Sequence, residues 1–327
     1  MGRGRDATSP WQMPRGAWKD VLLRAYKETS GDNIGLIAAG VSFYAFLALL
    51  PLLGAIVLTY GIVADPQTVV RNMTAMTKVM PQDVAQFIGE QLLYVVQTSG
   101  GKKGLGVFVA LALALFSARN GAGAIVTALN IAYEEEEKRG LVKVNLLALL
   151  ITAAAVLMAV FALLSMAILA AVETLLPSLP LVALLSKLLS YMLLGLAAAA
   201  AAATLYRFGP SRDRARWVWL TPGSLFFAVT WVMLTLLFGL YVSQFGNYSA
   251  TYGSLATVVI LLTWLYLSSY LLLFGAEMNS ELEHQTARDT TRGAEHPLGQ
   301  RNAWAADHVA AGPGEPAKNP GLPGRDG

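Results

Sequence analysis

Cysteine and charge are what this sequence lacks. The chain of 327 residues contains no cysteine, which excludes disulfides, thiolate metal sites and thiol nucleophiles. Only 14% of the residues are charged, whereas about 25% is usual in soluble domains. With 55% hydrophobic residues and a mean hydropathy of +0.51, the composition excludes an ordinary soluble globular protein and predicts several membrane spans.

Histidine is also scarce, and its placement argues against enzyme chemistry. The three histidines, His284, His296 and His308, all lie near the C-terminal end. Acid–base and metal-assisted hydrolysis need clustered acids or histidines that hold metals or move protons. Glu281 and His284 have the spacing of a carboxylate–histidine metal motif, but such a site needs a second copy, which the sequence lacks. We therefore expect no enzyme, no metal and no cofactor.

The chain carries a formal net charge of +3 and has an isoelectric point near 9.0. A basic balance would suit a nucleic-acid partner, but the basic residues of membrane proteins collect on cytoplasmic loops because they set the orientation. We therefore expect no nucleic-acid partner, and the expected partner is the lipid bilayer. The sequence leaves open whether copies of the chain form a homo-oligomer.

Six apolar segments are each long enough to cross the roughly 30 Å hydrocarbon core of a bilayer as a helix. The last, Tyr252–Phe274, runs without a charge and then meets Glu277, Glu281 and Glu283. The fold class is therefore predicted to be all-α, a polytopic membrane bundle of six transmembrane helices with amphipathic surface helices. The predicted spans are about 34–63, 105–129, 144–172, 181–205, 218–242 and 252–274.

The polar segments around the spans are predicted to be surface structure or disorder. Residues 1–17 and 286–327 are predicted to be disordered tails on either side of a membrane domain at 18–285. Helical spacing in Trp18–Ser30 and in part of the loop 65–103 predicts amphipathic helices on the membrane surface. On the first of these helices, one face is predicted to hold Val21, Leu22, Ala25 and Tyr26.

Lysine and arginine mark one side of the membrane. They occur before the first span, after the second and after the fourth, whereas the short stretches 173–180 and 243–251 contain none. The long loop 65–103 holds four, and the rule is weaker for long loops. The positive-inside rule then places both termini in the cytoplasm. The four consecutive glutamates that follow the second span, Glu134–Glu137, are interpreted as a solvated charge run.

Polar residues inside the spans are the candidate functional residues. Arg119 and Asn120 lie within the second span, and a charged side chain there costs at least about 2.5 kcal/mol unless it faces protein or water. Arg119 and Glu277 are expected at comparable depth, so with Asn120 they are predicted to line or gate a cytoplasm-facing cavity. The alternative is a purely structural ion pair that fixes helix packing.

Three further groups of residues carry predictions. Ser42 and Tyr44 lie in mid-helix, where hydrogen bonding between helices is preferred to ligand contact. Pro51 removes a helical hydrogen bond and predicts a kink in the first span. In the outer loop 244–252, an outer mouth is one interpretation and interfacial anchoring by aromatic side chains is the preferred one; the residues concerned are Asn247, Tyr248 and Tyr252.

Three stretches resemble a known family. AAGVSFYAFLALLPLL (38–53) resembles the opening motif of the YihY/BrkB family of bacterial inner-membrane proteins, and ALNIAYEEEEKRG (128–140) resembles its segment after the second span. Residues 237–283, which end in LFGAEMNSELE, match its signature end. The resemblance covers roughly residues 20–285 and implies a six-span protein of the bacterial inner membrane.

The resemblance implies no settled activity. Family members have been labelled ribonuclease BN, a virulence factor for serum resistance, and transporters. A transporter-like protein that translocates a solute or lipid fits the intramembrane polar residues best. A membrane scaffold for envelope integrity or virulence is the alternative, and a ribonuclease is the least favoured because histidine is confined to the end of the chain.

Overall fold

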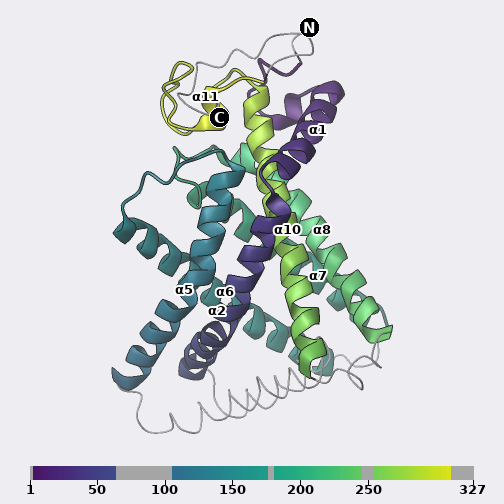
Figure 1. The fold of residues 1–327 in the computed structure, drawn as a ribbon. Coiled ribbons are helices and arrows are strands. Elements are labelled where there is room, and N and C mark those ends of the chain that lie inside the picture. Colours follow the sequence, from purple (N-terminus) through teal and green to yellow (C-terminus); the bar gives the residue numbers. More distant parts are fainter. Residues whose placement is uncertain (1–2, 64–104, 176–179, 245–253, 311–327) are drawn as a thin grey trace. The chain divides into compact units, whose positions relative to one another are not determined.

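The computed structural model describes residues 3–63, 105–175, 180–244 and 254–310. These residues form helices and one isolated β-bridge, between Ala215 and Thr291, so the predicted all-α fold class is confirmed (Figure 1). The short helices are η1 (Pro10–Gln12) and α11 (Trp304–Asp307). The long helices are α1 (Arg15–Gly31), α2 (Ile34–Val63), α5 (Leu105–Ala132), α6 (Leu141–Leu175), α7 (Pro180–Phe208), α8 (Trp217–Gln244) and α10 (Ser254–Gln285).

Five of these helices, α5, α6, α7, α8 and α10, are long and apolar enough to cross a membrane. A sixth candidate is the pair formed by α1 and the first part of α2, which is bent by 66°. A multi-pass membrane protein is therefore confirmed, and the count of six spans stays a prediction. The long apolar runs make these helices because a helix satisfies every backbone hydrogen bond without water.

The chain divides into two compact units. The first unit comprises Met1–Phe43, Ala124–Gly140 and Leu194–Gly327, and the second comprises Tyr44–Gly123 and Leu141–Leu193. In the second unit, α2 and α5 approach closely at Gly121, where an added Cβ would lie 3.0 Å from the Cβ of Ala48.

The core of the first unit gathers the ends of five helices. Buried side chains from α2, α5, α7, α8 and α10 form one cluster, in which Tyr206 donates a hydrogen bond to the carbonyl of Leu272. Helices α8 and α10 pack most closely at Gly223 and Gly275, because a Cβ on Gly223 would lie only 2.1 Å from the carbonyl oxygen of Gly275. Glycine is thus required at this crossing by contact rather than by backbone conformation.

Helix α1 confirms the helix predicted near the N-terminus. Its buried residues recur every four positions and pack along α10, beside which α1 lies in Figure 1. Leu22 and Tyr26 of the predicted apolar face do not belong to this buried set, and their exposed fractions are 42% and 64%. The buried face consists of Ala17, Val21, Ala25 and Thr29.

The described parts of both termini differ from the predicted disorder. Ala7 and Met13 are buried in a cluster with Trp219 of α8 and residues of α10. Beyond α10, Arg301 holds its own loop together by donating hydrogen bonds to four backbone carbonyls, those of Ala287, Arg288, His296 and Ala306. Composition indicated disorder, whereas these specific bonds satisfy the backbone of a segment that is poor in regular structure.

Candidate functional site

The acidic end of α10 is held in place by its neighbours in the first unit. Asn279 accepts a hydrogen bond from the backbone nitrogen of Gly223 at 2.8 Å and donates one to the carbonyl of Leu220. Both partners lie on α8, so this single side chain fixes the register of the two helices where they cross. The signature sequence therefore places its carboxylates at defined positions.

Glu283 belongs to a fully buried ion pair. Its Oε1 accepts a hydrogen bond from Arg212 at 2.6 Å, and the two side chains are 0% and 1% exposed. The hydroxyl of Thr290 donates to the other oxygen of Glu283, and the guanidinium of Arg212 lies 4.7 Å from the ring centroid of Tyr133. The charge of Glu283 is thus neutralised and hydrogen-bonded, as a buried charge requires.

Glu281 joins α10 to α1. Its carboxylate accepts a hydrogen bond from the Nε of Arg24, which also donates from Nη2 to Gln285 at 2.7 Å. His284 lies 3.5 Å from the other oxygen of Glu281. Glu281 is therefore paired with Arg24, and His284 lies beside the same carboxylate.

Glu277 is the carboxylate of this helix that lacks such a partner. It is 3% exposed, and its Oε1 accepts no hydrogen bond from any residue that the structure describes. Glu277 lies one turn before Glu281 on the same face, and Glu28 lies one turn after Arg24 on α1. Since Arg24 and Glu281 are in contact, Glu277 faces the end of α1.

Three more carboxylates meet at that end, and we call them the acidic cluster: Glu28 of α1, Asp32 of the bend between α1 and α2, and Glu134 just after α5. One oxygen of each lies within 4.8 Å of the others. Two residues at this place have positive φ without being glycine, namely Asn33 at 54° and Glu134 itself at 55°. Such backbone geometry is uncommon and is retained where the surroundings enforce it.

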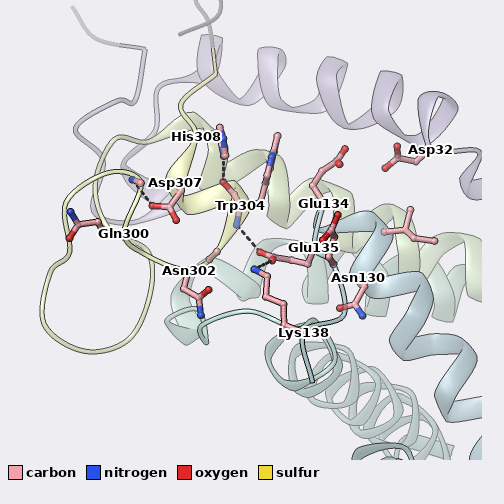
Figure 2. A pocket seen from close by; sticks show the side chains of 14 residues that line it. Asp32, Asn130, Glu134, Glu135, Lys138, Gln300, Asn302, Trp304, Asp307 and His308 are labelled. Carbon is pink, nitrogen blue, oxygen red and sulfur yellow. Dashed lines mark hydrogen bonds and ion pairs between the residues drawn. The ribbon is translucent and has the colours of Figure 1, made fainter. Parts of the chain in front are cut away.

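Asp32 and Glu134 of the acidic cluster border a cavity of about 880 Å³ in the first unit. Figure 2 shows Asp32 and Glu134 toward one end of this cavity and Asp307 and Gln300 toward the other. Its remaining polar wall comes from the loop after α5 and from the C-terminal segment. Its charged residues and histidine are Asp32, Glu134, Glu135, Glu136, Lys138, Asp307 and His308.

Glu135 and Trp304 connect the two walls of the cavity. The backbone nitrogen of Trp304 donates to Glu135 at 2.7 Å, and Lys138 lies 3.5 Å from the same carboxylate (Figure 2). Burial raises the pKa of Glu135, and the hydrogen bond from Trp304 and the charges of Arg212 and Lys138 oppose that rise. The prediction of a solvated glutamate run is therefore wrong for Glu135, which is buried, whereas Glu134 is half-buried and lines the cavity.

The predicted cavity or gate residues are not brought together by any described contact. Arg119 donates to the side chain of Asn145 on α6 and lies 4.4 Å from the ring centroid of Phe116, all within the second unit. Glu277 belongs to the first unit. A pair of Arg119 and Glu277 stays a prediction, and Asn120 is exposed.

The remaining predicted residues have these positions. The hydroxyl of Ser42 donates to the carbonyl of Ala39 in its own helix, and Tyr44 is 48% exposed. Pro51 lies inside α2, which continues on both sides of it, so the kink there stays a prediction. The outer-mouth residues and the second amphipathic segment lie outside the described residues, namely Asn247, Tyr248, Tyr252 and 84–96.

The profile of the family described as virulence factor BrkB matches residues 25–298, which is most of the chain. The chain belongs to the BrkB family. The resemblance found in the sequence is thereby confirmed.

Individual relatives of this BrkB-family chain carry two kinds of name. A ribonuclease-like protein of Bacillus subtilis, YfkH, is 33% identical over 57% of the chain and 69% of its own length. A UPF0761 membrane protein of Verminephrobacter eiseniae is 27% identical over 86% of the chain and 66% of its own length. Another, from Pseudoalteromonas translucida, is 39% identical over 21% of the chain and 23% of its own length.

No solved structure matches the chain. The relatives' names establish a family of membrane proteins, and the word ribonuclease stands in the name of YfkH.

Sequence reasoning singled out Glu277 but missed Glu28, Asp32 and Glu134 as its neighbours. These residues lie far apart along the chain, and each has an ordinary explanation on its own: a charged face, a helix cap and a charge run. The one available signal was the position of Glu134 directly after an apolar helix that ends in the family motif ALNIAYEEEEKRG.

Proposed function

We propose that this BrkB-family protein translocates a small cationic solute across the bacterial inner membrane, with both termini in the cytoplasm. The single observation that carries the proposal is the acid-lined cavity at the ends of the spans in the first unit. Its volume falls within the roughly 300–1,000 Å³ of small-molecule sites. Because acidic residues outnumber Lys138 on its wall, its field concentrates cations at this entrance.

Flux measured in proteoliposomes tests the proposal. Uptake of organic and inorganic cations and scrambling of labelled phospholipid are measured side by side against protein-free vesicles. The expected result is cation flux that falls at least about fivefold in Glu136→Lys, which reverses one exposed charge on the cavity wall. The matched control is Glu295→Lys, which reverses an exposed charge that is not among the lining residues.

A membrane scaffold is the alternative, and the interlocked contacts around the end of α10 favour it. Side chains of that end bond to the N-terminal segment as well as to α8, since Gln285 and Thr286 donate to the carbonyls of Arg3 and Arg5. A scaffold gives no flux of either kind above protein-free vesicles, and that result would overturn transport.

A ribonuclease is less favoured by the site. His284 and His308 both lie against Trp304, with ring centroids 5.1 Å and 4.7 Å away. RNA cleavage by protein freed of contaminating nuclease, lost in His308→Ala, would support this activity instead.

A further inference from the structure

We propose that Arg207, Arg214 and Arg292, which we call the basic cluster, bind the headgroup phosphate of an anionic phospholipid at the membrane surface where α7 ends and α8 begins. All three arginines belong to the first unit. None of them is among the residues that line the cavity, so the site is separate from the proposed translocation.

Backbone pairing brings two of these arginines together. Ala215 and Thr291 form the isolated antiparallel β-bridge, and the backbone nitrogen of Arg292 donates to the carbonyl of Arg214 at 2.9 Å. Arg214 and Arg292 are therefore opposite each other on the two paired segments, and both are exposed. Like charges opposite each other repel, so this pairing loses stability unless an anion offsets the repulsion.

Aromatic rings place Arg207 beside the other two arginines. Its guanidinium lies 4.4 Å from the ring centroid of Trp217 and 5.8 Å from that of Phe208, and the guanidinium of Arg214 lies 4.8 Å from the same Phe208 ring. The charged groups with the strongest effect on Arg207 are Arg292 and Arg214, both positive. Because Arg207 is only 5% exposed, water screens this repulsion only in part.

The carboxylates close by do not neutralise the basic cluster. Arg212, which lies between its members in sequence, pairs with Glu283. In the part of the chain that the structure describes, no member of the cluster forms an ion pair, not even Arg214 with the adjacent Asp213. Asp289 instead accepts hydrogen bonds within its own segment. An anion from outside the chain can therefore supply the missing negative charge.

The basic cluster lies where a bilayer surface is expected. The candidate span in α7 ends at Phe208, and that in α8 begins at Trp217, which is 51% exposed. Tryptophan is enriched at the membrane–water interface, at the depth of the lipid headgroups. A guanidinium binds phosphate through two parallel hydrogen bonds, and basic groups between helix ends on the cytoplasmic side bind anionic headgroups. The chemistry of the cluster therefore matches a headgroup phosphate.

An exposed and largely apolar face of α8 begins at the cluster and favours a lipid over a free phosphate ion. Residues at four-residue intervals follow one ridge of a helix. Such a ridge on α8 is exposed throughout and consists of Trp217, Thr221, Leu225, Val229 and Met233. An acyl chain can lie along this ridge while its headgroup stays at the arginines, whereas a free phosphate ion has no apolar part.

Thermal unfolding of the purified full-length protein in mild detergent tests the site. The delipidated protein is titrated separately with phosphatidylglycerol, with phosphatidylcholine as a zwitterionic lipid, and with glycerol phosphate as the free headgroup. Because a ligand that binds only the folded state stabilises it, we expect a saturable rise in unfolding temperature with phosphatidylglycerol alone. A rise of the same size with phosphatidylcholine, or with glycerol phosphate at the same concentration, would overturn an anionic-lipid site, as would no response to phosphatidylglycerol.

Exposed arginines of the cluster locate the headgroup. Arg214→Gln and Arg292→Gln are each expected to raise the half-saturating concentration of phosphatidylglycerol about fivefold, the contribution of one basic residue near an anionic surface. Arg288→Gln is the matched control, because Arg288 is exposed on the same C-terminal segment and is not among the charged groups that act on Arg207. Its half-saturating concentration is expected to stay within about twofold.

Both cluster variants change exposed side chains, so their unfolding temperatures without lipid are expected to match that of the unchanged protein, which separates lost binding from lost folding. An equal loss of affinity in Arg288→Gln would mean diffuse attraction to a basic surface and would overturn the site. Binding of a short single-stranded RNA that is lost in both cluster variants would assign the arginines to nucleic acid instead.

Discussion

Glu283 and Glu277 lie on the same helix and are buried to the same degree, with exposed fractions of 0% and 3%, but they face opposite surroundings. Arg212 and Thr290 donate hydrogen bonds to Glu283, whereas the Oε1 of Glu277 has no hydrogen-bond partner among the described residues. The charge of Glu283 is neutralised by an arginine of the same chain, and Glu277 is buried without such a partner among the described residues. The same acidic motif therefore places two carboxylates in opposite electrostatic surroundings.

Removing Arg212, the partner of Glu283, is expected to cause the largest loss of stability. Arg212→Ala leaves a fully buried carboxylate unpaired, which costs about 3–5 kcal/mol in free energy of unfolding. The measurement is the unfolding of the purified protein in mild detergent. Arg288→Ala, which removes an exposed arginine nearby, is the control and is expected to change stability by less than about 0.5 kcal/mol. Equal effects of the two would mean that the buried pair contributes nothing specific.

Disturbing the close contact between Gly223 of α8 and Gly275 of α10 is expected to give the next largest loss of stability. Gly223→Ala places a methyl group against the carbonyl of Gly275 and the side chain of Asn279, so we expect a loss of about 1–3 kcal/mol from overpacking. Gly239→Ala lies on the same helix, and its added methyl group meets nothing within 4 Å. A drop in unfolding temperature for Gly223→Ala alone supports the close crossing of α8 and α10, and similar temperatures for both variants would contradict it.

The sequence predicts the helices but not the contacts between them. The helices follow from the length of their apolar runs, because such runs in lipid leave the backbone few alternatives. The sixth predicted span ends near residue 274, whereas α10 continues to Gln285. The extension contacts Arg24 of α1 and Arg212 of the segment between α7 and α8, and hydropathy carries no information about such partners.

The candidate site was predictable only in part for the same reason. A charged residue within or next to an apolar span is unusual, so the sequence pattern indicated both Glu277 and Arg119 as candidate functional residues. Pairing them required knowledge of which helix faces meet, and the described partner of Arg119 is Asn145. The acidic cluster joins residues from separate elements, each unremarkable by itself, and only the fold brings them together.

The comparison of Glu281 with Glu277 gives a smaller effect. Glu281→Gln loses its ion pair with Arg24, and we expect a loss of about 1–2 kcal/mol in free energy of unfolding. Glu277→Gln breaks no hydrogen bond at Oε1 among the described residues, so its unfolding temperature is expected to stay within about 2 °C of that of the unchanged protein. A fall in that temperature as large as the fall for Glu281→Gln would show that the carboxylate of Glu277 is already satisfied by the protein.

The smallest expected effect is a difference between Glu135 and Glu137 in how their contribution to stability changes with pH. Hydrogen bonds from Arg139 lower the pKa of Glu137 from 4.5 to about 2, against a smaller opposing effect of burial. This contribution to stability is fully present above about pH 4.5 and is lost as the pH falls through about 2. Because the pair is partly exposed, we expect it to amount to less than about 1 kcal/mol.

Unfolding temperatures measured between pH 6 and pH 2 test this contrast. Glu137→Gln is expected to lower stability at pH 6 and to make the acid limb shallower. The pKa of Glu135 is raised by burial, so its ionised form costs stability at neutral pH and that cost disappears on acidification. Glu135→Gln, which keeps an oxygen to accept the bond from Trp304, is therefore expected to maintain or raise stability at pH 6. Parallel pH profiles for the two variants would mean that burial and pairing do not distinguish these two carboxylates, and that Glu135 behaves as a solvated charge.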